Sequence, residues 1–233
     1  MPPAHRSSPT LIALGILTGA FLVPNAGNAS LSGSPDLAAA PGALQAEDPE
    51  CFIETGMDLD DRASPLDSTT VELGGEPAKV CHGAPSARGR TMIGGEEVPY
   101  GEPWRLGANE ATGLHLTFPA QLGDVELAPG SYSLYAIPDA DEWTLVVNGE
   151  AERWGIPIDE DVMAQDVGRT PAPRDHPDDE HVETLQIHFE EVDENEAHLV
   201  MEWETYRIAV PLQRIDGEAR DAAGLEANPA TGG

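Results

Sequence analysis

The chain has 233 residues and is strongly acidic, with 42 Asp and Glu against 12 Lys and Arg and a formal net charge of −30. This charge excludes nucleic acids and anionic membrane surfaces as partners, because both bind positively charged proteins. The acidic residues are spread along the chain after its N-terminal segment. This spread favours a solvated exterior adapted to high salt over an acidic interaction surface or a calcium-binding surface.

The first 29 residues have the pattern of a secretory signal peptide. His5 and Arg6 give a positive start, Leu11 to Val23 is apolar, and the small residues Gly27-Asn28-Ala29 follow. A helix needs about 20 apolar residues to span a bilayer, so this run favours a cleaved signal over an uncleaved anchor. We therefore expect an exported protein, periplasmic or extracellular, without membrane insertion.

Residues 30–49 are rich in Ala, Gly, Ser and Pro and are predicted to form a flexible linker. The acidic segment 50–67 contains Cys51, and the chain has one other cysteine, Cys81. In an oxidising compartment such a pair favours a disulfide over metal ligation or two free thiols. The bond would tether the acidic segment, and a loop of about 30 residues gives a stabilisation on the order of 3–4 kcal/mol.

Short runs with alternating apolar residues follow, separated by Gly, Pro and Asn turns. One helix is predicted within Glu152–Val167, capped by Asp159 and ending near Gly168. Arg169–Asp179 is predicted to be a loop, and 215–233 a disordered tail. The predicted strands are Thr69–Leu73, Ala78–His82, Leu114–Phe118, Asp124–Leu127, Tyr132–Ile137, Trp143–Asn148, Glu183–Phe189, Ala197–Trp203 and Tyr206–Leu212.

These elements predict an all-β domain over residues 68–214 with one short helix and long loops. An antiparallel β-sandwich is the first choice and a flattened barrel the second. Gly74-Gly75 is predicted to form a hairpin turn. Trp143–Asn148 is apolar on both faces, which indicates a central, covered strand.

The stretch Pro85–Thr112, predicted mostly as loop, is the one place where positive charge gathers in this acidic chain. Guanidinium groups bind carboxylate, sulfate or phosphate in bidentate fashion, and a tryptophan offers a flat wall for a ring. One interpretation is a loop-built site for a small anion or a glycan. The alternative is a scaffold in which Arg105 pairs with Glu110. The candidate ligand-binding residues are Arg88, Arg90, Trp104, Arg105, Asn109 and Glu110.

Catalytic and metal motifs are scarce. The chain lacks G-x-S-x-G, H-E-x-x-H and a phosphate-binding glycine loop, so Glu110 is the one acid considered as a general acid or base. His115, His188 and His198 face away from the apolar side of their predicted strands, and solvated histidines are favoured over a zinc or copper site. We expect no metal and no cofactor.

Several motifs occur in a distinctive order: PSARGRTMIGG, VPYGEPWRLGANEAT, PGSYSLYAIP, EWTLVVN, a lone RWG and LVMEWE. This order resembles the secreted bacterial family called domain of unknown function 2911, over about Ser68 to Leu212. The resemblance implies an exported, single β-rich domain and no assigned activity. His82 departs from the pattern, which has an aromatic residue there.

The sequence thus predicts an exported, non-catalytic binding or envelope-associated module whose partner is a small anionic ligand or a glycan. Two alternatives remain open. One is an extracytoplasmic hydrolase using Glu110, and the other is a purely structural or interaction protein.

Overall fold

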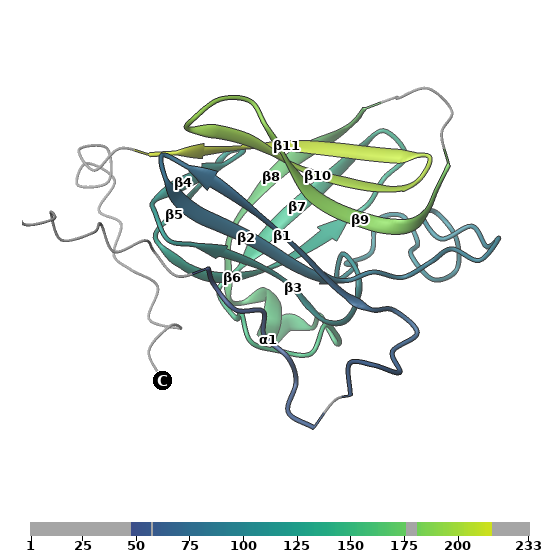
Figure 1. Ribbon diagram of the computed structural model, residues 1–233. Helices are drawn as coiled ribbons and strands as arrows, with labels where there is room; N and C mark the ends of the chain where they lie inside the picture. The colour runs from purple at the N-terminus through teal and green to yellow at the C-terminus, as the bar shows by residue number, and fades with distance from the viewer. Residues whose placement is uncertain (1–47, 57, 176–180, 216–233) are drawn as a thin grey trace, which may run out of the picture. The chain divides into compact units, whose positions relative to one another are not determined.

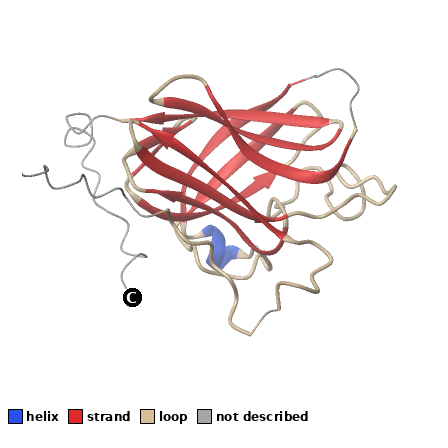
Figure 2. Ribbon diagram, viewed as in Figure 1, coloured by secondary structure: helices blue, strands red, loops and turns tan. Residues whose placement is uncertain are grey.

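A computed structural model describes residues 48–56, 58–175 and 181–215, and these residues form an all-β fold with one short helix (Figures 1 and 2). The helix α1 spans Glu160–Met163. The strands are β1 (Leu66–Leu73), β2 (Glu76–Gly83), β3 (Ala108–Leu116), β4 (Ala120–Leu122), β5 (Val125–Leu127), β6 (Gly130–Ile137), β7 (Glu142–Asn148), β8 (Asp166–Asp175), β9 (Val182–Glu191), β10 (Glu196–Glu204) and β11 (Tyr206–Arg214).

Every strand pair is antiparallel, and the strand order is β1-β2-β3-β6-β7-β8-β11-β10-β9, with β4 and β5 attached beside β11. The strand β8 joins two layers, because it pairs with β7 along most of its length and with β11 at Arg174 and Asp175. In Figure 1, β9, β10 and β11 lie above β1, β2, β3 and β6. The predicted antiparallel fold is confirmed, and the curled sheet fits both a sandwich and a flattened barrel.

The curl brings the two ends of the strand order, β1 and β9, side by side. The hydroxyl of Thr69 in β1 donates to the carbonyl of Ile187 in β9 at 3.4 Å. Just after β2, the amide of Ala87 donates to the carbonyl of Glu183 at 2.8 Å, and the amide of Leu185 donates to the carbonyl of Pro85 at 2.9 Å. The sheet is therefore nearly closed, and the loop that follows Ala87 starts at this seam.

The core lies between the two layers and follows the two-residue period of the strands. Leu114 and Leu116 of β3 are buried, as are Leu185 of β9 and Leu199 of β10. Trp143 begins a run that is buried on both faces of β7, as its apolar sequence predicts. Alternation therefore marks the inner face of β1, β8 and β11, whereas β3, β6 and β7 are buried at most positions on both faces.

Turn chemistry explains two of the connections. Gly74 and Gly75 form the two-residue turn between β1 and β2, with φ of +61° and +79°. Both angles suit glycine and match the primed turn that hairpins favour. The side chain of Asp159 accepts from the amide of Val162 at 3.1 Å and caps α1, as predicted.

Three local predictions are wrong. Arg169–Asp175 belongs to β8, where Pro171 and Pro173 lie on the exposed face while Thr170 and Ala172 point inward. Strand β3 spans Ala108–Leu116, so it begins six residues before the predicted strand Leu114–Phe118 and includes the end of the stretch Pro85–Thr112, the rest of which is loop as predicted. The helix ends at Met163 and not near Gly168, because Asp166 already starts β8.

The predicted signal peptide (1–29), the predicted linker (30–49) except its last two residues, and the predicted tail (215–233) except Ile215 lie outside the described residues. Within the described part of the chain, α1 is the one helix, and it is too short to cross a membrane.

Candidate functional site

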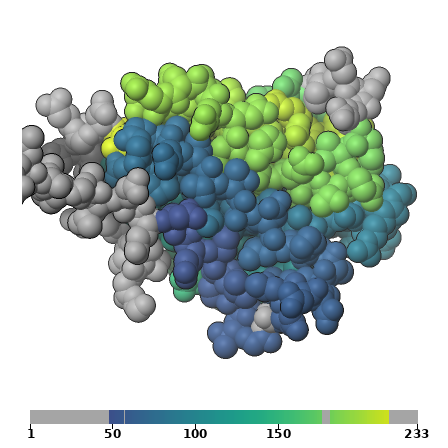
Figure 3. All heavy atoms as spheres, viewed as in Figure 1, coloured from purple at the N-terminus to yellow at the C-terminus, as the bar shows by residue number. Residues whose placement is uncertain are grey.

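The acidic segment is held against the folded domain by a disulfide. Cys51 and Cys81 are bonded across a separation of 30 residues, as predicted, and Cys81 lies in β2. Asp48 adds a salt bridge to Lys79 of the same strand at 2.8 Å. In Figure 3 the purple and blue spheres of this segment lie directly on the domain. The tether brings residues distant in sequence to the start of β3.

One of these residues is Arg62, which forms a buried ion pair with Glu110 of β3. Its Nη1 and Nη2 donate to the two carboxylate oxygens at 2.7 and 2.8 Å, and both side chains are 5% exposed. The amide of Glu54 adds a third hydrogen bond at 3.0 Å. Burial favours the neutral form of Glu110, but the bonds from Arg62 and Glu54 outweigh it and lower the pKa. Glu110 is therefore ionised, and both of its carboxylate oxygens already accept hydrogen bonds.

The pair expected between Arg105 and Glu110 does not form, because Arg62 occupies the carboxylate. Asn109 is also structural. Its side-chain amide donates to the carbonyl of Ser64 at 2.9 Å, and its own carbonyl accepts from the amide of Gly155 at 2.9 Å. Its φ of +65° falls in the left-handed region, which asparagine tolerates well.

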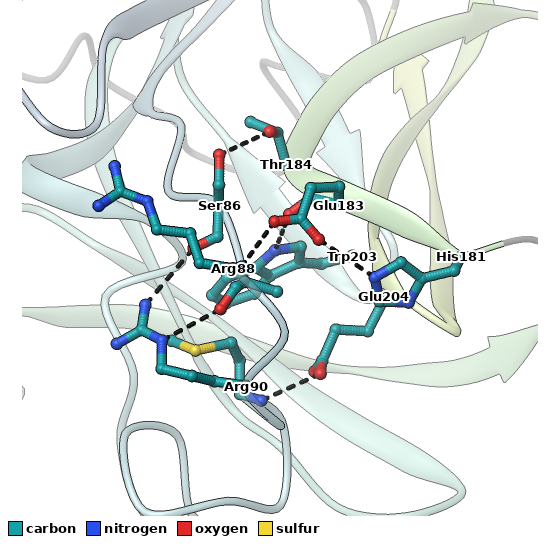
Figure 4. A network of polar contacts seen from close by, with 10 residues as sticks. Ser86, Arg88, Arg90, His181, Glu183, Thr184, Trp203 and Glu204 are labelled. Carbon is teal, nitrogen blue, oxygen red and sulfur yellow. Dashed lines mark hydrogen bonds and ion pairs between the residues drawn. The ribbon is translucent and has the colours of Figure 1, made fainter.

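The loop after Ala87 carries the other two candidate arginines, shown in Figure 4. The backbone amide of Arg88 donates to Glu183 at 2.6 Å, while its guanidinium points away from the network and reaches the carbonyl of Ala63 at 3.3 Å. The guanidinium of Arg90 folds back on the loop, donating from Nε to the carbonyl of Ala87 at 3.0 Å. Its Nη1 lies 3.5 Å from a Glu97 oxygen.

Glu204 anchors the middle of this loop to the tip of the β10–β11 hairpin. Its carboxylate accepts from the amides of Met92 and Ile93 at 3.0 and 2.8 Å, and Glu204 is 9% exposed. Its φ of +55° is unusual for a glutamate. Two hydrogen bonds to a buried carboxylate offset this strain and fix the loop in place.

The loop closes over a cavity of about 380 Å³, here called the Arg105 cavity. Trp104 and Trp203 form one wall, with their rings stacked at 5.6 Å between centroids. Trp143 packs edge-on against Trp104 at 5.8 Å and supports it from the core. The lining residues are Ser64, Pro85, Arg90, Met92, Glu97, Val98, Pro103, Trp104, Arg105, Gly107, Ala108, Ile156 and Trp203.

Arg105 is the distinctive group of this cavity. Its Nε donates to the carbonyl of Gly107 at 3.1 Å, and it forms no ion pair with any carboxylate of the described residues. The side chain is partly buried, and this burial lowers its pKa. In a chain with so large an excess of acids, a half-buried arginine without a carboxylate is available for an external anion.

The backbone around Arg105 is strained. Of the four non-glycine residues with positive φ in the described chain, three lie in this stretch: Arg88, Leu106 and Asn109. Leu106 has φ of +54° and is fully buried, and its carbonyl accepts from the hydroxyl of Thr112 at 2.7 Å. Such conformations cost on the order of 1–3 kcal/mol each and cluster at functional sites.

The structure thus brings together Arg90, Trp104 and Arg105 at one cavity and places the other three candidates elsewhere. Arg88 lies on the surface beside β9, while Asn109 and Glu110 hold the acidic segment and the RWG segment (residues 153–155) against β3. Sequence reasoning missed Arg62 and Glu204. Arg62 is the one basic residue within segment 50–67, which is a signal that it has an acidic partner.

The histidines do not converge. His115 of β3 is buried, with Nδ1 at 2.8 Å from the hydroxyl of Ser131, while His188 and His198 lie on β9 and β10 beside Glu190 and Glu196. Within residues 48–56, 58–175 and 181–215, no group of three or more His, Cys, Asp or Glu side chains is arranged to hold a metal ion.

Fold and site together define a β-rich domain with a cavity lined mostly by one pinned loop. The chain belongs to the family described as Protein of unknown function (DUF2911), whose family model matches residues 64–212. The resemblance noted in the sequence is therefore confirmed. Comparisons with curated proteins and with solved structures found no match.

Proposed function

We propose that the protein is exported and acts as a binding module for a small ligand that carries an acid group. Support for export comes from the N-terminal pattern and from the disulfide, which is typical of oxidising compartments. Mass spectrometry of the secreted or periplasmic chain should find a mature N-terminus at Ser30, and a chain that retains Met1 in the cytoplasm would contradict export.

The observation that carries the binding function is Arg105, partly buried at the cavity and without a carboxylate partner among the described residues. A carboxylate, sulfate or phosphate would take its free donors in bidentate fashion. Arg90 lines the same cavity beside Glu97, whose carboxylate lies 3.5 Å away and offsets its charge, and the small exposed part of the Trp104–Trp203 wall gives apolar surface for part of a ring. These features fit a sugar or ring compound bearing one acid group.

A hydrolase that uses Glu110 receives less support. Glu110 is 4% exposed, its two oxygens accept from Arg62 and Glu54, and it does not line the Arg105 cavity. A general acid at neutral pH needs a raised pKa, whereas these bonds lower it. A purely structural role would not account for an arginine at an open cavity that has no carboxylate partner among the described residues.

The test is a thermal-shift and calorimetry screen with glucuronate, galacturonate and glucose 6-phosphate, with neutral glucose as the reference ligand. We expect acid-bearing sugars to bind and Arg105→Met to weaken them at least about tenfold, which corresponds to 1.4 kcal/mol. Arg88→Met is the matched control, since Arg88 lies in the same stretch but outside the cavity. Binding of no acid-bearing sugar, or equal losses in both variants, would contradict the proposal.

A further inference from the structure

A second cavity of about 650 Å³, here called the Arg153 cavity, lies next to the Arg105 cavity. Ile156 lines both cavities and is 55% exposed, so its side chain forms the ridge between them. The second cavity is lined by Gly149, Glu150, Arg153, Trp154, Ile156, Pro157, Asp159, Asp161, Val162 and Gln165.

The RWG segment, Arg153-Trp154-Gly155, fixes the positions of the two cavities relative to each other. The carbonyl of Arg153 accepts from the amide of Ala111 at 3.1 Å, and the amide of Gly155 donates to Asn109, so the segment extends the sheet beside β3. A Cβ at Gly155 would lie 2.5 Å from Cδ of Arg105. Only glycine allows the segment to pack this closely on the arginine of the first cavity.

Arg153 lines the second cavity and is 7% exposed. Its Nη1 donates to the carbonyls of Trp154 and Gly155 at 3.0 and 3.2 Å, whereas Nε and Nη2 are buried without a hydrogen-bond partner among the described residues. Burial lowers the pKa of this guanidinium. Buried donors left without acceptors cost free energy, so Arg153 keeps unused donor capacity beside the cavity that it lines.

The same cavity also offers acceptors. Glu150, Asp159 and Asp161 line it, and one oxygen of Asp159 is already used by the amide of Val162. Ionised carboxylates only accept hydrogen bonds and a guanidinium only donates them, so the matching ligand group must do both. Hydroxyl groups do both. A second anion is disfavoured here, because three carboxylates would repel it.

Trp154 supplies the remaining contact. Its indole is partly exposed at the cavity, and the apolar face of a sugar ring packs against such a flat surface. A ring rich in hydroxyls is therefore the chemistry that fits this mixture of donor, acceptors and aromatic surface.

We propose that the Arg153 cavity binds a neutral sugar ring that is linked directly to the acid-bearing unit held in the Arg105 cavity. The ligand class is then an acidic oligosaccharide, with its acid on Arg105 and its neighbouring ring on Trp154. This inference rests on the proposed function and specifies its ligand.

Calorimetry on the full mature chain tests the inference with aldobiouronic acids, in which a uronic acid is linked to a neutral hexose, covering the 1→2, 1→3, 1→4 and 1→6 linkages. We expect at least one of them to bind about tenfold or more tightly than its free uronic acid. Trp154→Ala should remove this gain and leave the affinity for the uronic acid within about twofold. Asp161→Asn, an exposed change on α1, should reduce the same gain without affecting the fold.

Val167→Ala serves as the control, since Val167 is an exposed apolar residue outside both cavities. If uronic acids bind through Arg105 but no disaccharide binds more tightly, the inference falls and the proposed function stands. A disaccharide gain that survives both Trp154→Ala and Asp161→Asn also overturns the inference. If neither uronic acids nor disaccharides bind, both proposals fall together.

Discussion

Two arginines reach the start of β3, and their surroundings differ in a way that separates scaffold from site. Arg62 is buried against Glu110, with both guanidinium-to-carboxylate bonds made. Arg105 borders an open cavity and, within the part of the chain that the structure describes, donates only to the carbonyl of Gly107. The same type of side chain is thus a structural tie at Arg62, where a carboxylate of the domain neutralises it, and is the proposed recognition group at Arg105, where no carboxylate of the described residues does so.

The two arginines also differ in the empty volume beside them and in the contacts that hold each region. Near Glu110 lies a void of about 10 Å³, lined by Cys81, His82, His115 and others, which leaves room for about one water molecule. The Arg105 cavity has about 380 Å³ and tryptophan walls. The closed region is tied by a disulfide and a buried ion pair, whereas the open region is shaped by a loop that Glu204 pins in place.

The largest expected effect comes from breaking the closed pair. Glu110→Leu leaves the Arg62 charge buried without its partner, and we expect the free energy of unfolding to fall by about 3–5 kcal/mol. The double variant Arg62→Met with Glu110→Leu should recover most of this loss, because two apolar residues can replace a buried pair. Urea denaturation of the three proteins measures both values.

The matched change on the open side is Arg105→Met, which keeps the aliphatic stem that packs on Gly155. It should change the free energy of unfolding by less than about 1 kcal/mol, since no ion pair among the described residues is lost. If Glu110→Leu and Arg105→Met lowered the free energy of unfolding by equal amounts, the two arginines would not differ in structural role.

A smaller effect on the free energy of unfolding is expected when the pH is changed, and it again comes from the closed region around Glu110. Burial lowers the pKa of His82 and of His115 below 6.5. As the pH falls below about 6.5, these histidines bind protons in the unfolded chain but stay neutral in the folded chain. The free energy of unfolding therefore falls. Each histidine contributes a slope of at most about 1.4 kcal/mol per pH unit until its lower folded pKa is reached.

His82→Phe isolates this contribution, because phenylalanine fills the same buried position without a titrating group. Urea denaturation at pH 7.5, 6.5 and 5.5 should show stability declining less steeply in the variant than in the parent chain. The lowest pH stays above the usual range of carboxylates, so the comparison reports on histidine. An unchanged slope in the variant would show that His82 does not titrate differently in the folded state.

Sequence patterns predict the elements whose cause is local. Gly74-Gly75 forms the hairpin turn through backbone freedom, Asp159 caps α1 through its own side chain, and Leu185 and Ile187 alternate into the core. Strand β8 escapes prediction because Pro171 and Pro173 are typical of loops, and only their placement on the exposed face makes them compatible with a sheet.

The sequence also predicts part of the candidate site, because that part has a local cause. Arg90, Trp104 and Arg105 are visible in the sequence because arginines cluster in this loop beside a tryptophan, and the cavity contains all three. The partner of Glu110 is not visible, because Arg62 lies 48 residues away and meets it through the fold. Arg153 stands in the distinctive RWG motif, yet its unpaired edge depends on burial that only the structure supplies.

The seam between β1 and β9 has a consequence for the order in which the protein folds. Its contacts join residues 98 and 118 positions apart, whereas β1, β2 and the hairpin of β10 and β11 pair with near neighbours in the chain. Contacts over such long distances cost more chain entropy and form late. The loop that shapes the Arg105 cavity begins at this seam, so we expect the cavity to take its final form late in folding.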